Sequence, residues 1–397
     1  MLLDLMSLLL ALFTLVLGTG TFYFCLQCFA GLHPGYSQKL PLSRSSSLAV
    51  LVPAHNEELS LSHSLRSIRF QLRASDRLVV VADNCSDGTE TIARNQGAEV
   101  VVRTDPLHLG KGYALDAGLR YLSRNPPQVV MMLDADCTIA PDCLAHLDDL
   151  VCKRSKPAQA CYLMKAHTAE APHLAINEFA FLIKNCIRPR GLSRFHLPCH
   201  LTGSGMAFPW KALIQVELSS DHLAEDMKLG LDLAKIGQGA IYCNHAYVLS
   251  DFPTSLNGQT TQRHRWEKGR ANLAISSLRV LFSPRSYRHI GAPLLALDSL
   301  IPPLTALALL LSVHVSALII MQMFIQQVWL LWTATAILLL FLLTIACVWA
   351  TCGRSILPVR YWPAIMRYIT SRVGLYLALA VRANPQWIRT ERGVGDI

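Results

Sequence analysis

Apolar residues are distributed along this chain in two patterns. In the first pattern they dominate residues 5–32, 300–321 and 328–350, and these lengths match the roughly 20 helical residues that cross a bilayer core. None of the three stretches contains Asp, Glu, Lys or Arg. The pattern predicts an N-terminal membrane helix and, far along the chain, a hairpin of two membrane helices joined by "QMFIQQ".

The first stretch differs from a signal peptide. Its start, "MLLDLM", lacks basic residues, and its apolar run is longer than the apolar core of a signal. We therefore expect an uncleaved anchor. In the second stretch, Pro302 and Pro303 predict a kink near the start of the helix, and Asp298 is expected just before it at the membrane surface.

The second pattern lies between residues 46 and 290, where short apolar strands alternate with segments of helical spacing. Leu48–Val52 and "RLVVVAD" are apolar throughout, and residues 57–72 between them carry leucines and isoleucine at helical intervals. Strands without a polar face are typical of parallel sheets covered by helices on both sides. We predict an α/β domain with a mainly parallel sheet.

Polar residues follow several of these strands. Asn56 and Glu57 follow the first, Asp83 ends the second, and "VVMMLDAD" ends in Asp134 and Asp136. Residues i and i+2 of an extended chain point to one side, so the two carboxylates repel unless a cation lies between them. A lone pair of this kind is common in solvated turns, but ligands of such sheets bind beyond the carboxyl ends of the strands. The combination favours one polar crevice.

Composition and charge support a membrane protein. The chain is 52% hydrophobic and 16% charged, against about 25% charged residues in average chains. Its net charge is +9, and much of the positive charge flanks the apolar stretches at Lys39, Arg44, Arg354, Arg360, Arg367 and Arg372. The hairpin loop has no Lys or Arg, so the positive-inside rule places residues 33–290 and the tail in the cytoplasm, with the chain integral to the cell (inner) membrane. Anionic lipid explains the basic balance without nucleic acid.

The basic tail, residues 351–397, includes "YWPAIMRYITSRVGLYLALAVRA", whose apolar runs are interrupted by arginines. We expect residues 361–383 to form helices lying in the interface, with a tilted fourth membrane helix as the alternative. The twelve cysteines show no paired metal spacing, so neither zinc nor a disulfide framework is expected.

Six short motifs occur in a fixed order between about Ala49 and Arg270: P-x-x-N-E, D-N-x-S-D-G-T, G-K-G-x-A-L, D-A-D, E-D and Q-x-x-R-W. This order resembles family 2 glycosyltransferases, and more narrowly the membrane-integrated branch with cellulose, chitin, hyaluronan and poly-N-acetylglucosamine synthases. Each motif alone is a weak signal, whereas six in order are specific. The resemblance implies a GT-A-type nucleotide-sugar domain, together with transmembrane helices and amphipathic interface helices.

The resemblance also implies roles for individual residues. The donor would be bound by Pro53, Asn56, Glu57, Asp83, Lys111, Asp134, Gln262 and Arg265. Asp136, with Asp134 beside it, would hold Mg²⁺ or Mn²⁺, which prefer oxygen ligands. Asp226 would be the general base, next to Glu225 in the catalytic pair. Relatives often have Thr before this pair, and Ala224 departs from that pattern.

The acceptor side is implied in the same way. Trp266 of "QRHRW" would stack on the acceptor sugar, since aromatic faces pack against C–H groups. Gly203, Ser204 and Gly205 would lie near the donor sugar and the acceptor, although a plain tight turn fits these three residues equally well. Glu225 and Asp226 also fit as acidic residues that compensate a helix dipole.

The predicted layout has five parts. They are an N-terminal transmembrane helix (1–32), a cytoplasmic GT-A domain (46–254), the QxxRW interface helix (255–292), a transmembrane hairpin (293–350) and the basic interfacial tail (351–397).

We predict an inverting, metal-dependent hexosyltransferase. It would use a nucleotide sugar, expected to be UDP-linked and α-configured, to glycosylate a membrane-anchored, lipid-linked saccharide in exopolysaccharide or glycolipid biosynthesis, giving a β product. The alternative is a processive synthase that elongates and helps to export a β-linked polymer. Three spans are few for a closed channel, which favours a short acceptor, further polysaccharide-assembly subunits or a second copy of the chain. An inactive scaffold would be expected to have lost its carboxylates, but Asp83, Asp134, Asp136 and Asp226 all remain.

Overall fold

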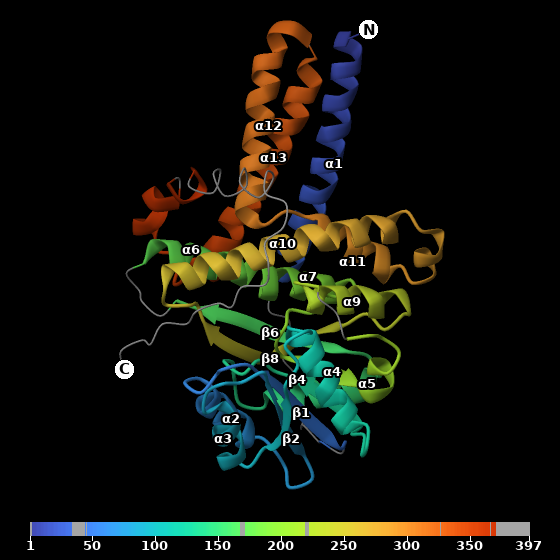
Figure 1. Cartoon of the computed structure of the whole chain (residues 1–397). Coiled ribbons are helices and arrows are strands. Elements are labelled where there is room, and N and C mark those ends of the chain that lie inside the picture. The colour runs from blue at the N-terminus through green and yellow to red at the C-terminus, as the bar shows by residue number, and fades with distance from the viewer. Residues whose placement is uncertain are drawn as a thin grey trace.

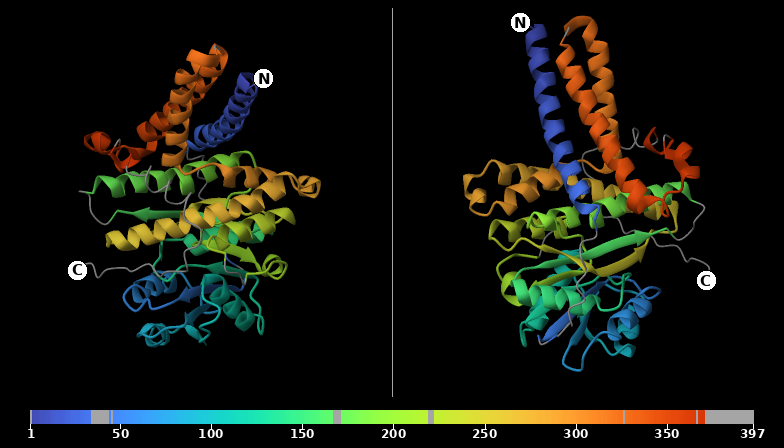
Figure 2. Two further views of the ribbon diagram at one scale, coloured as in Figure 1. Left: turned by 45° about the horizontal axis from the view of Figure 1, so that its top comes forward. Right: turned by 180° about the vertical axis from the view of Figure 1, so that it is seen from behind.

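The computed structural model of the protein describes residues 2–33, 44, 46–166, 171–218, 222–325, 327–365 and 367–370. The described residues form three levels (Figure 1). A sheet domain lies at one end, a layer of helices crosses its edge, and three long helices rise from that layer away from the sheet. The view from behind shows the same order of levels (Figure 2).

Eight strands in the described residues form one mixed sheet in the order β3-β2-β1-β4-β7-β6-β8-β5. They are β1 (Leu48–Ala54), β2 (Arg77–Asp83), β3 (Glu99–Arg103), β4 (Val129–Met132), β5 (Thr138–Ile139), β6 (Ala158–Lys165), β7 (Met206–Pro209) and β8 (Ile241–Asp251). The first four pair in parallel, as predicted. β7 runs antiparallel to both β4 and β6, so the sheet is mixed, and the α/β class is confirmed.

Helices cover both faces of the parallel half. They are α2 (Leu61–Arg69), α3 (Thr89–Asn95), α4 (Lys111–Leu122) and α5 (Cys143–Arg154). Alternate residues of β1 enter different clusters: Leu51 packs on the face with α4, and Val50 on the face with α2. This two-sided burial explains why the strands are apolar throughout. The helix predicted over residues 57–72 is shorter, because its first residues form the loop that leaves β1.

The middle level consists of helices that lie across the edge of the sheet domain (Figure 1). They include α6 (Pro172–Leu182), which continues through the π-helix η1 (Ile183–Ile187) into α7 (Arg188–Arg194), and also α9 (Glu225–Lys235), α10 (Leu256–Leu281) and α11 (Gly291–Leu300). The short α8 (Trp210–Leu213) follows β7, and the 3-10 helix η2 (Pro284–Arg288) links α10 to α11.

Three described helices are long and apolar enough to span a bilayer: α1 (Leu2–Gly31), α12 (Leu304–Ile325) and α13 (Val328–Val348), which runs on into the π-helix η3 (Trp349–Gly353). The expected kink at Pro302 and Pro303 is wrong in detail. The two prolines separate α11 from α12, since a proline disfavours helical geometry in the residue before it, and Ile301 is extended.

A buried polar cluster ties the membrane helices to the middle level. The Arg188 guanidinium donates to Asp298 at 2.5 Å and to the side-chain carbonyl of Gln27 at 2.6 Å, which connects α7, α11 and α1. Asp298 is therefore buried inside the protein and does not lie at the membrane surface as expected. Although burial would raise the pKa of this carboxyl, Arg188 and His200 hold it well below its usual range.

The described tail is short. A 3-10 turn, η4 (Val359–Tyr361), is followed by helical residues up to 370. Most of the predicted interface segment 361–383, and the linker with Lys39, lie outside the described residues.

Candidate active site

Two carboxylates lie just beyond β4. Ligand atoms of Asp134, Asp136 and Cys137 all lie within 4.8 Å of one another. The backbone N–H of Asp134 donates to Ser204 Oγ at 3.1 Å, which anchors the loop to the segment before β7. Burial, together with the two carboxylates, raises the pKa of the Cys137 thiol well above its usual value. Cys137 is thus a neutral neighbour, and the pair offers oxygen atoms that suit Mg²⁺ or Mn²⁺.

Gly203 marks the point where three functional side chains meet. Lys111, at the start of α4, donates to the Gly203 carbonyl at 2.6 Å and pairs with Asp134. Gly203 has a φ of +87°, and a Cβ there would lie 3.4 Å from Asp226 Oδ2, 3.5 Å from Lys111 Nζ and 3.8 Å from Asp134 Oδ2. Because Gly203 has no side chain, the predicted metal ligand Asp134, Lys111 and the predicted base Asp226 can lie close together beside its backbone.

Glu225 and Asp226 begin α9 at this point. Burial raises the pKa of the Glu225 carboxyl to about 7, and the neighbouring Asp226 charge adds to that rise while Lys111 opposes it. The backbone N–H of Met227 donates to Asp226 Oδ1 at 2.8 Å. A carboxyl group that takes up a proton near neutral pH is suited to acid–base chemistry, and Glu225 is the neighbour of the predicted base Asp226.

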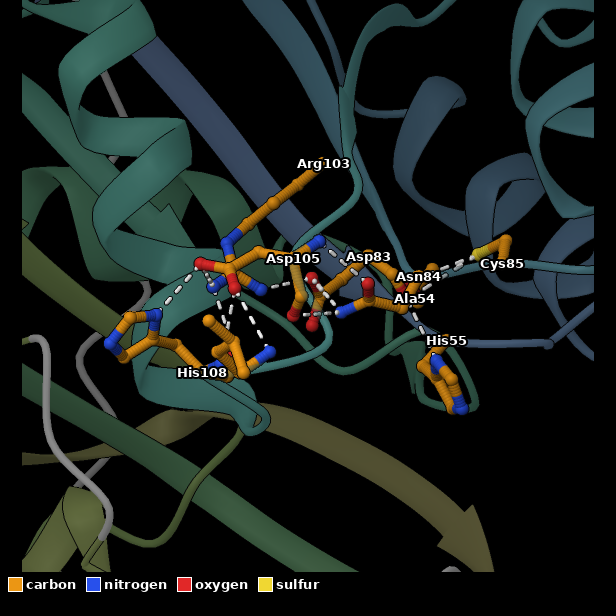
Figure 3. Close-up of polar contacts among 9 residues, drawn as sticks. Ala54, His55, Asp83, Asn84, Cys85, Arg103, Asp105 and His108 are labelled. Atoms are coloured by element: carbon orange, nitrogen blue, oxygen red, sulfur yellow. Dashed lines mark hydrogen bonds and ion pairs between the residues drawn. The ribbon is translucent and has the colours of Figure 1, made fainter.

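Asp83, at the end of β2, lies in a separate cluster of polar residues (Figure 3). Its carboxylate accepts hydrogen bonds from Arg103 at 2.5 Å and from the Asn84 amide at 3.0 Å. Arg103 also bonds Asp105 at 3.0 Å and the His108 carbonyl at 2.7 Å. The sequence prediction missed Arg103, although its place at the end of β3 follows the same strand-end rule that identified Asp83.

The loop after β1 runs beside Asp83. His55 bonds the Asp83 carbonyl at 2.7 Å (Figure 3). Asn56, with a φ of +53°, accepts from the Ser86 N–H at 2.7 Å, and the Glu57 N–H donates to Thr89 Oγ1 at 2.8 Å. Pro53 is the sixth residue of β1 and pairs with Val81. The loops that carry the P-x-x-N-E and D-N-x-S-D-G-T motifs are thus joined to each other by hydrogen bonds.

The Q-x-x-R-W motif lies on α10 and points in two directions. Gln262 is buried, and Trp266 lies with its ring centroid 5.8 Å from that of Phe181; both line a cavity beneath the membrane helices. Gly269, four residues after Arg265 and hence on the same helix face, packs so closely that a Cβ there would lie 3.0 Å from Ala224 Cβ. Arg265 is therefore on the face of α10 directed at the start of α9.

The remaining predicted residues, Ser204 and Gly205, support the packing of the backbone around the site. Ser204 is fully buried and holds the Asp134 loop. Gly205, with a φ of +70°, leaves space for Val248 and Ala160, since a Cβ there would lie 2.6 Å and 2.9 Å from their side chains. Of the three residues Gly203, Ser204 and Gly205, the first lies directly at the carboxylates. The structure thus brings Lys111, Asp134 and Asp226 together, with Asp83 held in a separate cluster.

Comparison with known proteins supplies a family. A family model described as "Glycosyltransferase like family 2" matches residues 45–269, which is more than half of the chain. The matched segment contains all six motifs, from Pro53 to Trp266.

Similarity to individual proteins covers shorter or more distant regions. A glycosyltransferase of Mycobacterium tuberculosis is 38% identical over 117 residues, 28% of this chain and 49% of the relative. The 4,4'-diaponeurosporenoate glycosyltransferase of Staphylococcus aureus is 34% identical over 94 residues, 23% of this chain and 24% of the relative. The matched segment thus spans half or less of these relatives.

Among solved structures, a mannosyltransferase from Pyrobaculum calidifontis, in complex with GDP-Man and Mn²⁺, is similar to nearly the whole chain. It covers 94% of this chain and 99% of its own at a TM-score of 0.56 and 19% identity. This likeness concerns the fold.

Proposed function

Because the chain belongs to the glycosyltransferase-like family 2, we propose that it is an inverting, metal-dependent hexosyltransferase of the membrane-integrated branch. The meeting of Lys111, Asp134 and Asp226 around Gly203 is the observation that carries this proposal. It brings together the carboxylate proposed for the cation, the lysine proposed for the phosphate and the carboxylate proposed as the base.

The proposed chemistry divides the work among these residues. Asp136 and Asp134 would hold Mg²⁺ or Mn²⁺, which when bound neutralises the charge that develops on the departing nucleoside diphosphate. Lys111 and Arg265 would bind the diphosphate, while Asp83 and the loop residues Pro53, Asn56 and Glu57 would hold the nucleoside end. Gln262 lines the cavity on the other face of α10, so of these two residues we assign the donor contact to Arg265.

Asp226, with Glu225 as its neighbour in the pair, would take the proton from the acceptor hydroxyl as that oxygen attacks the anomeric carbon. The new bond forms on the face opposite the departing diphosphate, so an α-linked donor would give a β product. Trp266 would stack on the acceptor.

The setting favours an acceptor in the membrane. α10 carries Gln262 and Trp266 and belongs to the middle level, which lies between the sheet domain and the three long helices (Figure 1). We propose that the catalytic domain lies in the cytoplasm, and the charge asymmetry of the flanking segments supports this orientation. We propose that a UDP-sugar glycosylates a lipid-linked saccharide or lipid in exopolysaccharide or glycolipid synthesis, and that further subunits or a second copy assist.

A processive synthase is the second candidate, because the D, D, D and Q-x-x-R-W motifs also occur in polymer synthases. Three described membrane-length helices are few for a closed export channel, so we favour addition of one or a few sugars.

A donor panel tests the proposal. The purified full chain, with Mn²⁺ and membrane lipid extract, is given UDP-glucose, UDP-N-acetylglucosamine, UDP-galactose and GDP-mannose, and release of nucleoside diphosphate is measured with and without lipid. We expect one donor to be used, with release dependent on lipid and on the metal. Absence of lipid-dependent release with every donor contradicts the proposal.

A further inference from the structure

A cavity of about 150 Å³ lies between the catalytic domain and the membrane helices. We name it the interface chamber, and define it by Phe24 of α1, Phe181 of α6, Lys184 of η1, Trp266 and Arg270 of α10, and Pro303 before α12. It has room for several water molecules or for the headgroup of a lipid. Its walls come from the bases of α1 and α12 and from the Q-x-x-R-W helix, so it joins the membrane surface to the catalytic domain.

The interface chamber is strongly basic. Lys184, Arg188, Arg263 and Arg270 line it, and Glu267 is an acidic residue of the same lining. Arg188 is paired with Asp298. Arg263 bonds the neutral Asn177 side chain at 3.3 Å, and Arg270 bonds the Ile301 carbonyl at 3.2 Å. Burial also raises the pKa of the Glu267 carboxyl, which weakens its value as a counter-charge.

Lys184 is held in this chamber by an unusual piece of backbone. It is the second residue of the π-helix η1, and single π-turns within α-helices frequently occur at functional sites. Its Nζ lies 5.8 Å from the centroid of the Phe181 ring. Burial, and then the charge of Arg270, lower the pKa of the Lys184 amine to about 8. A buried amine that is destabilised by neighbouring cations would be stabilised by a bound anion.

These cations are distinct from the residues proposed for the donor diphosphate. Gln262, Trp266 and Arg270 follow one another at intervals of four along α10 and face the chamber. Arg265 and Gly269 share another face, which packs on Ala224 at the start of α9. The helix therefore separates a donor side from a membrane side, while the charge of Asp226 still acts on Lys184.

We propose that the interface chamber binds the phosphate of a membrane lipid headgroup, and that the acceptor of this enzyme is a phosphate-bearing lipid. The role of this lipid as the acceptor rests on the proposed function, whereas the binding of its phosphate rests on the residues that line the chamber. Lys184 and Arg270 would hold the phosphate, Trp266 and Phe181 would pack against the adjoining apolar atoms, and the hydroxyl to be glycosylated would extend toward Asp226.

Lipid binding to the purified full chain tests this. The chain in neutral maltoside micelles is titrated with phosphatidylglycerol, with diacylglycerol of the same tails, and with inorganic phosphate, and bound lipid is measured by native mass spectrometry. We expect phosphatidylglycerol to bind most tightly. Lys184→Met and Arg270→Gln should each weaken it about tenfold or more, as expected for loss of a charge-assisted hydrogen bond.

Lys153→Met is the matched control, because Lys153 lies on α5, pairs with Asp149 at 2.8 Å and is distant in the fold from the chamber. Its affinity should equal that of the wild type. Lys184→Met should unfold at no lower temperature than the wild type, since it removes a buried charge repelled by Arg270, so weaker binding there is not a folding defect.

A pH series adds an independent readout. The groups that act on Lys184 are Arg270 and Glu267 of α10, Arg188 of α7 and Asp226 of α9. The amine is charged below a pKa of about 8 and neutral above it, whereas a phosphodiester keeps its charge throughout this range. Affinity for phosphatidylglycerol should fall between pH 7 and pH 9 in the wild type, and should stay level in Lys184→Arg.

Three results overturn the inference: equal binding of diacylglycerol and phosphatidylglycerol, unchanged affinity in both chamber variants, or inorganic phosphate binding as tightly as the lipid, which would make this a soluble-phosphate site. Failure of the proposed function is seen separately, because Asp136→Asn and the donor panel report on transfer and leave lipid binding untouched. If phosphatidylglycerol binding depends on Lys184 but no sugar transfer is found, the lipid-phosphate site stands and the proposed enzyme function is wrong.

Discussion

Asp136 is the residue on which the proposed metal site depends most. Changing it to Asn preserves size but removes the charge that would hold the cation, so we expect turnover to fall by roughly a hundredfold or more. Activity titrated with Mn²⁺ is the measurement. Asp149→Asn, a partly exposed ion-paired carboxylate on α5, is the control and should behave as the wild type. A wild-type rate with wild-type metal dependence in Asp136→Asn would show that the ligand is assigned wrongly.

Asp226 should separate the base from donor binding. Asp226→Asn removes the group that accepts the acceptor proton, so transfer should fall by about 10²- to 10⁴-fold. Calorimetry with the nucleoside diphosphate and Mn²⁺ should give the wild-type affinity. If nucleotide affinity is lost together with activity, Asp226 belongs to the donor site.

Glu225 predicts the pH profile. Burial, and then the charge of Asp226, raise the pKa of its carboxyl to about 7, so Glu225 takes up a proton as the pH falls through 7. The negative charge that Glu225 carries above this pH favours transfer of a proton to the neighbouring carboxylate and so strengthens the proposed base, and activity should therefore rise with pH through about 7. Glu225→Gln removes the group that binds this proton, so its profile should be flatter between pH 6 and 8. An unchanged midpoint in that variant would remove Glu225 from the titrating pair.

Much of the site was predictable because its residues follow strands. Asp83, Asp134 and Asp136 come directly after apolar strands, and the sheet brings their ends to one edge. Arg103 was missed because one basic residue after a strand has no distinctive spacing. Lys184 was missed for a stronger reason, since its position depends on a π-turn and on the packing of helices that are far apart in the sequence.

At the scale of elements, the contact between α10 and α9 should control activity. A Cβ at Gly269 would lie 2.9 Å from the Leu223 carbonyl carbon and 3.0 Å from Ala224 Cβ, so Gly269→Ala must push α10 away from the Glu225–Asp226 pair. Since small misplacements of reacting groups are costly, we expect activity to drop about 10- to 100-fold. The matched control is Gly20→Ala in α1, where the nearest atom would lie 4.0 Å away. Equal activity in the two variants would show that this contact does not position the base.

The Arg188–Asp298 pair should hold the membrane helices on the middle level. Arg188→Met leaves the buried Asp298 carboxylate without its guanidinium partner, with His200 at 3.2 Å and Gln27 at 2.5 Å as its remaining contacts, and the expected loss of stability is about 3–5 kcal/mol. Thermal unfolding in micelles measures it. The double variant Arg188→Met, Asp298→Leu should regain much of the loss, because no charge is then stranded. A double variant as unstable as the single one would mean that the pair's charge is not the cause.

Elements with strong periodicity were predicted well, and those set by tertiary contacts were not. The apolar strands and the three membrane-length helices follow from their residues alone. The antiparallel β7 is short, and its direction depends on pairing with β4 and β6, which local pattern does not encode. The break between α11 and α12 was misplaced because Pro302 and Pro303 are compatible with either a kink or a helix end.

At the scale of the whole molecule, three levels are stacked in an order that suits chemistry at a membrane surface (Figures 1 and 2). The Asp134 and Asp136 carboxylates lie in the sheet domain, the Q-x-x-R-W helix crosses the middle level, and the interface chamber opens beneath α1 and α12. Donor and acceptor would thus approach the base from opposite sides of α10. The membrane-length helices offer an anchored acceptor a route to that chamber.

The partition of labelled product tests this account most directly. The purified full chain is placed in liposomes made from membrane lipid extract and supplied with Mn²⁺ and a radiolabelled donor chosen by the panel, with Asp226→Asn as the inactive control. We predict that the label moves into the organic phase as a lipid carrying one or a few sugars, and that the control leaves it as donor. A large, lipid-free, polymer-sized product made by the chain alone would contradict the account and establish the processive synthase in its place.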